Sequence, residues 1–323
     1  MRKLKNTLKP FALHEELKKR FPDRFRPGLV YHYTTKEVLF ELTKGGAKLF
    51  ATYFRTLNDN QEYNKGLSYV LKNYLPRHNK DILKLLKPYI EDEDEWLRRE
   101  TPNKPILLPW VMSLSRSADS LYQWRAYTDS DDGGVAIGFD FEELEKLTSI
   151  SVSARRARKD SDPTALAYEL HFLPCLYLDE ESKEDVARAN KILDFLFKEW
   201  YEVRKKEVGF TKREDCAVLA LVVANLFALI TKNASFRDEH EVRLVLFLKD
   251  PKYFGNISFV GGKPRIEIPL PRDTGIKVNS LIKKVIISPH GDKCMLRSIV
   301  DMAAIKNGLN YKIKRSVSSF NGR

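Results

Sequence analysis

Short apolar runs bounded by turn residues recur along the chain. Runs of about 4–8 apolar residues flanked in this way are typical of strands that enter a core. One of them, at residues 241–248, first alternates and then becomes continuously apolar. The pattern predicts strands at residues 29–33, 48–52, 107–115, 135–139, 168–178, 241–248, 265–268, 283–288 and 311–314.

Segments with apolar residues three and four positions apart predict helices, which are concentrated in the middle of the chain. Thr34 and Thr35 are the N-cap candidates for the helix that follows the first strand. Ser117 is the candidate cap for a helix that runs through Tyr127, and Asp140 for the next one. The other predicted helices lie at residues 12–20, 36–43, 60–75, 82–99, 182–206, 212–232 and 293–307.

This order of elements predicts the α+β class: a mixed, mainly antiparallel β core with inserted and flanking helices. The 323 residues, of which 43% are hydrophobic, suffice for a substantial core. We expect a basic lead-in at residues 1–27, a single α+β domain at 28–317 and a tail at 318–323. Within the domain, the helical insertion is expected around residues 181–232.

The chain is basic, with a formal net charge of +12. Residues 1–30 carry nine Lys and Arg against three Asp and Glu, and residues 306–323 carry five basic residues and no acid. A basic surface favours polyanions such as nucleic acid. A solvated tail with a basic helix is the alternative. A non-catalytic nucleic-acid-binding or regulatory module, aided by a basic loop at 151–163, therefore stays open.

The three cysteines, Cys175, Cys216 and Cys294, lack the paired spacing of a zinc site or a disulfide framework. A sparse, odd number of cysteines fits a reducing compartment. The most apolar run, residues 216–230, is shorter than a bilayer-spanning helix requires. We therefore expect a cytoplasmic protein that binds neither a metal nor a membrane.

Several segments together resemble the bacterial domain-of-unknown-function family 2971. The most specific combines Ser113-Leu114-Ser115, residues 123–127 and the strand at 133–139. Asn60 and Ser288 depart from the family pattern, which tends to have proline and glycine at these positions. The weaker segments are residues 31–35, 57–62, 236–244 and 285–289.

The order of elements is more loosely similar to the ADP-ribosyltransferase superfamily, so a fold of that type is expected. The resemblance implies NAD as the substrate, with His32 on the ribose, Tyr127 or Trp124 against the nicotinamide, and Glu241 polarising the glycosidic bond. It also implies a nucleic-acid or protein acceptor, and a role as a toxin or in phage defence. The implied catalytic residues are Glu241, His32 and Tyr127; the implied NAD-binding residues are Tyr33, Thr34, Ser113, Ser115, Trp124 and Arg125.

Each candidate also has a structural interpretation. His32 can be a satisfied structural histidine, Trp124 a core residue, and Glu241 one half of an ion pair with Arg243. A turn and helix cap can account for Asn58, Asp59 and Glu62. A carboxylate-dependent nuclease is a further alternative if the fold brings together Asp59, Glu62, Glu239 and Glu241.

Overall fold

The computed structural model describes most of the chain between its ends. The predicted loop at residues 151–163 and the second half of the helix predicted at 82–99 lie outside the described residues, as do Asn58 and Asp59. The described residues are 17–20, 22–25, 27–44, 47–57, 60–90, 108–128, 131–146, 168–208, 211–248, 257–260, 262–268 and 277–318.

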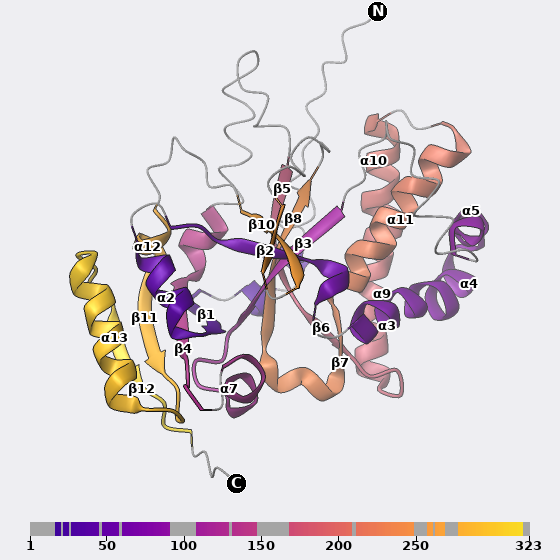
Figure 1. The fold of residues 1–323 in the computed structure, drawn as a ribbon. Helices are drawn as coiled ribbons and strands as arrows, with labels where there is room; N and C mark the ends of the chain where they lie inside the picture. The colour runs from indigo at the N-terminus through magenta and orange to yellow at the C-terminus, as the bar shows by residue number, and fades with distance from the viewer. Residues whose placement is uncertain are drawn as a thin grey trace, which may run out of the picture.

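A ten-stranded sheet forms the centre of the molecule (Figure 1). Its strands run in the order β12-β11-β4-β1-β3-β2-β10-β9, and β8 pairs with β3 and with β5. The strands are β1 (Leu29–Thr34), β2 (Phe50–Tyr53), β3 (Leu108–Ser115), β4 (Val135–Asp140), β5 (Tyr168–Pro174), β8 (Glu241–Leu248), β9 (Ile257–Val260), β10 (Lys263–Glu267), β11 (Ile282–Ile287) and β12 (Lys312–Arg315).

The sheet is mixed and mainly antiparallel, which confirms the predicted α+β class. Within it, β11 and β12 pair in parallel, and the other described pairings are antiparallel. A separate two-stranded parallel sheet joins β6 (Leu176–Leu178) and β7 (Thr231–Asn233). The helical segment between β6 and β7 is therefore closed at its base by strand pairing.

Helices cover both flanks of the sheet. The α-helices are α2 (Lys36–Thr43), α3 (Asn60–Ser68), α4 (Leu75–His78), α5 (Lys80–Ile90), α7 (Leu121–Tyr127), α9 (Lys183–Asp194), α10 (Tyr201–Val208), α11 (Arg213–Ile230), α12 (Val278–Leu281) and α13 (Lys293–Lys306). The 3-10 segments are η1 (Pro22–Phe25), η2 (Phe54–Thr56) and η6 (Ala234–Glu239), and the π-helical segments are η3 (Tyr69–Tyr74) and η5 (Phe195–Trp200).

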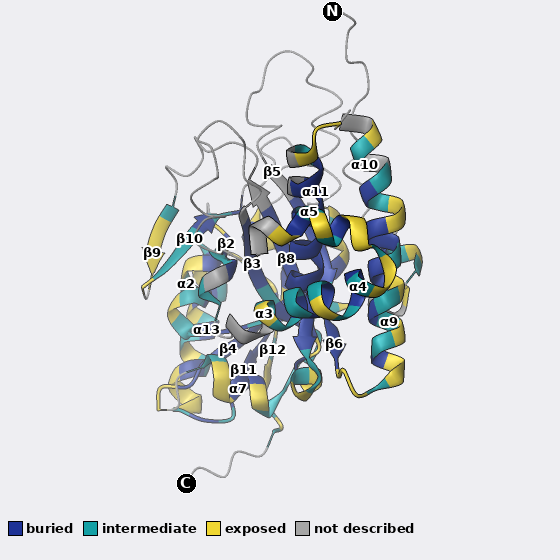
Figure 2. Cartoon of the chain, turned by 90° about the vertical axis from the view of Figure 1, so that its right-hand side faces the viewer, coloured by how far each residue is buried: buried dark blue, intermediate teal, exposed yellow. Residues whose placement is uncertain are grey.

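The apolar helix α11 is the centre of one helical layer. It contacts α3, α5 and α10, and these helices lie together on the right of Figure 1. Figure 2 shows α11 and the central strands as the most buried part of this side, whereas the outer faces of α9 and α10 are exposed. On the opposite flank, α13 packs against α2 and β11. The sheet is thus buried between two unequal helical groups.

Several predicted boundaries were wrong for local reasons. The cap of α7 is Ser120, whose side chain accepts from the backbone N–H of Gln123, and not Ser117. Thr34 is the buried last residue of β1 and does not cap α2. The helix predicted to reach residue 232 ends at Ile230, because the next residues pair with β6. The strand predicted at 168–178 divides after Pro174, and β9 was not predicted.

Among the described helices, none has the length and apolar character that crossing a bilayer requires.

Candidate functional site

One edge of β3 receives two different strands, and this divides the sheet. β2 pairs with this edge at Trp110 and Val111, whereas β1 pairs with it only through Tyr31, opposite Ser115. The opposite edge of β3 pairs with β8 along its whole length. We call the stretch of β3 between Val111 and Ser115, with β1 and β2 diverging on either side, the strand fork.

His32 occupies this fork. Its Nδ1 lies 3.3 Å from the carbonyl oxygen of Ser113, and the ring is half-buried. Burial lowers the pKa of His32 and the charge of Arg265 lowers it further, while the bond to Ser113 opposes both effects. The imidazole is therefore neutral near neutral pH. Because a carbonyl can only accept, Nδ1 carries the proton, and Nε2 is left as an acceptor.

The rows of the sheet place the other candidates on the face opposite to the Cβ of His32. Tyr31, Ser115 and Glu241 are successive Cα partners across β1, β3 and β8, so they share one face of the sheet. His32 is the next residue along β1, so its Cβ projects toward the opposite face. The bond to Ser113 nevertheless holds its ring at the gap between the strands.

Glu241 is buried and lies in a cluster of four charges: Lys232, Glu239, Glu241 and Arg243. Its Oε1 accepts from Arg243 Nε at 2.8 Å, and its Oε2 accepts from Lys232 Nζ at 2.7 Å. Lys232 also donates to Glu239. Burial alone raises the pKa of Glu241, but the charges of Arg243 and Lys232 outweigh it and hold the pKa well below its ordinary value. We call these four residues the buried charge cluster.

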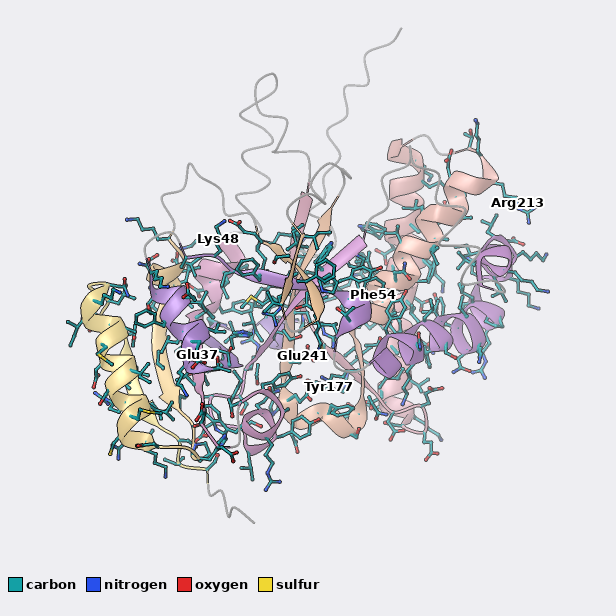
Figure 3. All side chains as sticks on the ribbon, in the orientation of Figure 1. Glu37, Lys48, Phe54, Tyr177, Arg213 and Glu241 are labelled. Carbon is teal, nitrogen blue, oxygen red and sulfur yellow. The ribbon has the colours of Figure 1, made fainter. Side chains whose placement is uncertain are left out.

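The buried charge cluster is neutral as a whole and is held by neighbouring backbone groups. Two carboxylates face two cations. The backbone N–H of Glu241 donates to the Tyr177 hydroxyl at 2.6 Å, and Arg243 Nη1 donates to the Leu229 carbonyl at 2.6 Å. Figure 3 shows Glu241 at the centre of the molecule with Tyr177 directly beside it in the view. The cluster therefore supplies a permanently ionised carboxylate on rigid elements.

Helix α7 covers this corner of the sheet. It contacts β1 and η6. The ring of Tyr122 on α7 packs against the ring of Phe236 on η6, with the centroids 6.0 Å apart. Trp124 is fully buried, packs edge-on against Tyr33 at 4.6 Å, and donates its indole N–H to Asp119 at 2.6 Å. Trp124 is thus a core residue.

The remaining residues of α7 and β1 differ in how far solvent reaches them. Tyr127 is half-buried beside the Tyr33–Trp124 pair, and Arg125 is exposed. Tyr33 is buried and donates its hydroxyl proton to the Ser117 carbonyl at 2.9 Å. Ser113 is half-buried and lies on the same face as Arg243. Of these residues, Ser113, Arg125 and Tyr127 retain the most access to a ligand.

Ser115 and Glu239 serve the local structure. The Ser115 hydroxyl donates to the Glu239 carbonyl oxygen at 2.6 Å and accepts from the Ser117 N–H at 3.0 Å. Glu239 is the last residue of η6, so it does not stand in an extended strand with Glu241. Both carboxylates nevertheless meet, because each one binds Lys232.

Two of the four carboxylates of the proposed nuclease set lie outside the description. Asp59 lies outside the described residues, and Glu62 lies on α3, at a position whose side chain is likewise outside the description. In the part of the chain that the structure describes, no group of three or more His, Cys, Asp or Glu residues has the arrangement of a metal site. Glu239 and Glu241 are instead neutralised by Lys232 and Arg243.

Lys232 is the residue of the site that the sequence reasoning missed. It is 4% exposed and follows directly after the apolar helix α11. Its signal in the sequence is a lysine that follows a mainly apolar helix and precedes two acids by seven and nine residues. A charged residue in such a setting is buried by the chain on both sides and requires partners.

The comparisons with known proteins agree with the family resemblance. No curated protein and no solved structure is significantly similar to the chain. Residues 123–244 match the family DUF2971, described as a protein of unknown function. The matched segment runs from α7 through β4 and the helical segment into β8, and it includes the whole buried charge cluster. Over these residues, the chain is similar to the DUF2971 family.

Proposed function

We propose that the chain binds NAD at the strand fork and breaks the bond between nicotinamide and ribose. The adjacency of β1, β3 and β8 supports this proposal, because it brings a neutral imidazole and an ionised carboxylate to one end of the sheet. Neighbouring strands lie about 4.8 Å apart, so the backbones of residues 32 and 241 are separated by roughly 10 Å. Since the Cβ of His32 projects toward the face opposite Glu241, a ligand that contacts both groups must reach them through the strand fork.

The reaction separates charge in a direction that suits these two groups. Nicotinamide leaves with the electron pair of the glycosidic bond, and positive charge develops on the ribose. Water or an acceptor nucleophile attacks the sugar and gives its proton to Nε2 of His32. A nearby carboxylate stabilises the positive sugar, and electrostatic stabilisation of this kind is usually the largest catalytic contribution.

Glu241 can take this role only if one of its cations moves. Lys232 has a second carboxylate partner in Glu239, so it can remain paired when it leaves Glu241. Arg243 still holds both oxygens of Glu241, Oε1 through Nε at 2.8 Å and Oε2 through Nη2 at 3.2 Å, and keeps the carboxylate ionised. The exchange thus removes the shorter of the two hydrogen bonds to Oε2 without leaving a buried charge alone, which would be costly.

The expected NAD contacts narrow to residues that solvent reaches. Tyr127 is the candidate for the face of the nicotinamide ring, since Trp124 is fully enclosed. Ser113 and Arg125 are the remaining polar candidates, because Tyr33, Thr34 and Ser115 are buried. A nucleic-acid or protein acceptor, a cytoplasmic location, and a role as a toxin or in phage defence belong to the same proposal.

The test follows nicotinamide release from labelled NAD. Glu241→Gln is expected to lower the turnover roughly 10²-fold or more, the usual cost of removing one electrostatic contact to a transition state. Glu142→Gln, at an exposed position just after β4, is the matched control and is expected to keep full turnover. Thermal unfolding of both variants establishes that they fold.

The unaltered protein supplies a second arm if Glu241→Gln fails to fold. Calorimetry with NAD is expected to show saturable binding to the intact chain. Absence of both NAD binding and nicotinamide release in the intact chain overturns the proposal. Equal turnover in folded Glu241→Gln and Glu142→Gln overturns the role of the carboxylate.

A further inference from the structure

Three lysines lie together on one face of the parallel pair β11–β12, at one edge of the sheet. Lys284 and Lys312 are Cα partners, and Lys314 follows two residues later on the same face of β12. Lys312 and Lys314 are exposed, and Lys284 is half-buried. Strand geometry puts neighbouring members about 5 to 7 Å apart at the backbone. We call these residues the lysine patch.

Within the part of the chain that the structure describes, the charges of the lysine patch lack carboxylate partners. Among the described residues, none of the three forms an ion pair, and the Nζ of Lys284 rests 5.7 Å from the centre of the Tyr31 ring. The pKa of Lys284 is lowered, first by burial and then by the charges of Lys314 and Lys312, against an opposing effect of Asp119. The positive charges of the three lysines therefore repel one another until an anion binds between them.

Asp119, the acid whose charge acts on Lys284, is already hydrogen-bonded elsewhere. Asp119 accepts from the Ser316 hydroxyl at 2.6 Å, from the Val317 N–H at 2.7 Å and from Trp124 at 2.6 Å. These bonds, together with one from Ser318, hold the pKa of Asp119 below its ordinary value although burial opposes them. Its carboxylate is directed to the chain end and not to the patch, so the patch remains available to an external anion.

We propose that the lysine patch binds the phosphate backbone of a nucleic-acid strand. Lysine ammonium groups bind phosphates as point charges, and two of the three here, Lys312 and Lys314, are exposed. Such a surface gains affinity only from several phosphates at once, which favours a polymer over a single nucleotide. Tyr31 beside it is buried and cannot stack on a base, so we expect binding without sequence preference.

This proposal is independent of NAD cleavage, because it concerns the edge of the sheet and needs no catalysis. The other explanation for lysines on an edge strand is that they prevent pairing with another chain. That explanation predicts aggregation when the lysines are neutralised, with unchanged binding of nucleic acid. Affinity and solubility therefore separate the two roles.

The test measures binding of a labelled DNA single strand of about 20 nucleotides, longer than the roughly 4–16 nucleotides that one single-strand site covers. Lys312→Gln combined with Lys314→Gln is compared with Lys72→Gln combined with Lys80→Gln. The control lysines are exposed on η3 and α5 and carry the same total charge. Anisotropy is recorded without NAD over a series of salt concentrations.

The patch variant is expected to bind several-fold to tenfold more weakly than the control. Its slope of log affinity against log salt should fall by about 1.4, at about 0.7 for each lost contact to a single strand. Equal affinity and slope in the two variants overturn the proposal. It is also overturned if inorganic phosphate competes as well, per phosphate, as the oligonucleotide, since the patch then selects the ion and not the polymer.

Discussion

Lys232→Met removes one of the two cations that neutralise Glu239 and Glu241, while preserving most of the volume of the side chain. One of the two buried carboxylates then lacks a full counter-charge. Breaking a buried ion pair by removing one partner costs about 3–5 kcal/mol. Since each kcal/mol shifts the melting temperature of a domain of this order of size by about 2–4 °C, we expect a loss of roughly 6–20 °C.

The pH dependence distinguishes lost charge pairing from lost packing. In the unaltered protein the folded pKa of Glu241 lies below its unfolded value of 4.5, so its contribution to stability is present above that pH and is lost as the pH falls. In Lys232→Met the folded pKa rises, because one cation is gone. The cost of the substitution should therefore shrink from its value at about pH 7 as the pH falls below about 4.5.

A second substitution should rescue the first. Glu239→Gln added to Lys232→Met leaves Glu241 and Arg243 as one balanced pair. The double variant is then expected to be more stable than Lys232→Met alone, so the two effects are not additive. Urea unfolding of the single and double variants at about pH 7 and below about pH 4.5 measures the free energies of unfolding.

The control is Lys198→Met. Lys198 pairs with Asp194 at 2.6 Å, but both side chains are at least 40% exposed, so the loss should stay within about 1 kcal/mol. The reasoning is refuted if Lys232→Met costs no more than this control. It is also refuted if Glu239→Gln lowers the stability of Lys232→Met further.

Two further predictions concern the ends of the site. Asp119→Ala should lower the free energy of unfolding by roughly 1–3 kcal/mol, because the buried indole N–H of Trp124 and the segment at 316–318 lose their acceptor. The variant should also be trimmed faster at this end by a protease, and unchanged trimming contradicts the prediction. His32 should titrate below its ordinary pKa of 6.5 by NMR, with the proton of the neutral ring on Nδ1. Because the unfolded chain takes up this proton more readily, stability should fall as the pH drops below about 6.5, and His32→Gln should remove that dependence.

The features that could be predicted from the sequence are the helices, strands and contacts that depend on local periodicity. The run that became β8 was recognised with its correct bounds, and α2 matched residues 36–43. The two-residue spacing of Glu241 and Arg243 on a strand correctly suggested an ion pair as one interpretation, and the structure contains it. Such features need only the alternation of a strand and no knowledge of distant segments.

Features that depend on long-range pairing could not be predicted in the same way. The strand fork exists because β1 and β2, which follow one another around α2, both pair with β3. No local pattern states where β1 will leave that edge. The role of Lys232 could not be predicted for another reason. After Lys232 the chain turns through η6, which is capped by His240, a non-glycine residue with φ of 46°. Only then does Glu241 begin its strand.

The composition of the buried charge cluster argues that it does more than join two elements. One pair, Glu241 with Arg243, would satisfy both of those buried groups. Lys232 and Glu239 add a second pair, and burying each further ion carries a desolvation cost of several kcal/mol that well-packed apolar residues would avoid. The double variant Lys232→Met/Glu239→Gln removes the second pair and keeps the first, so it tests what the second pair is for. If the second pair is only structural, the fold of this variant survives and nicotinamide release is unchanged. If Lys232 gates the carboxylate, release changes while the protein remains folded.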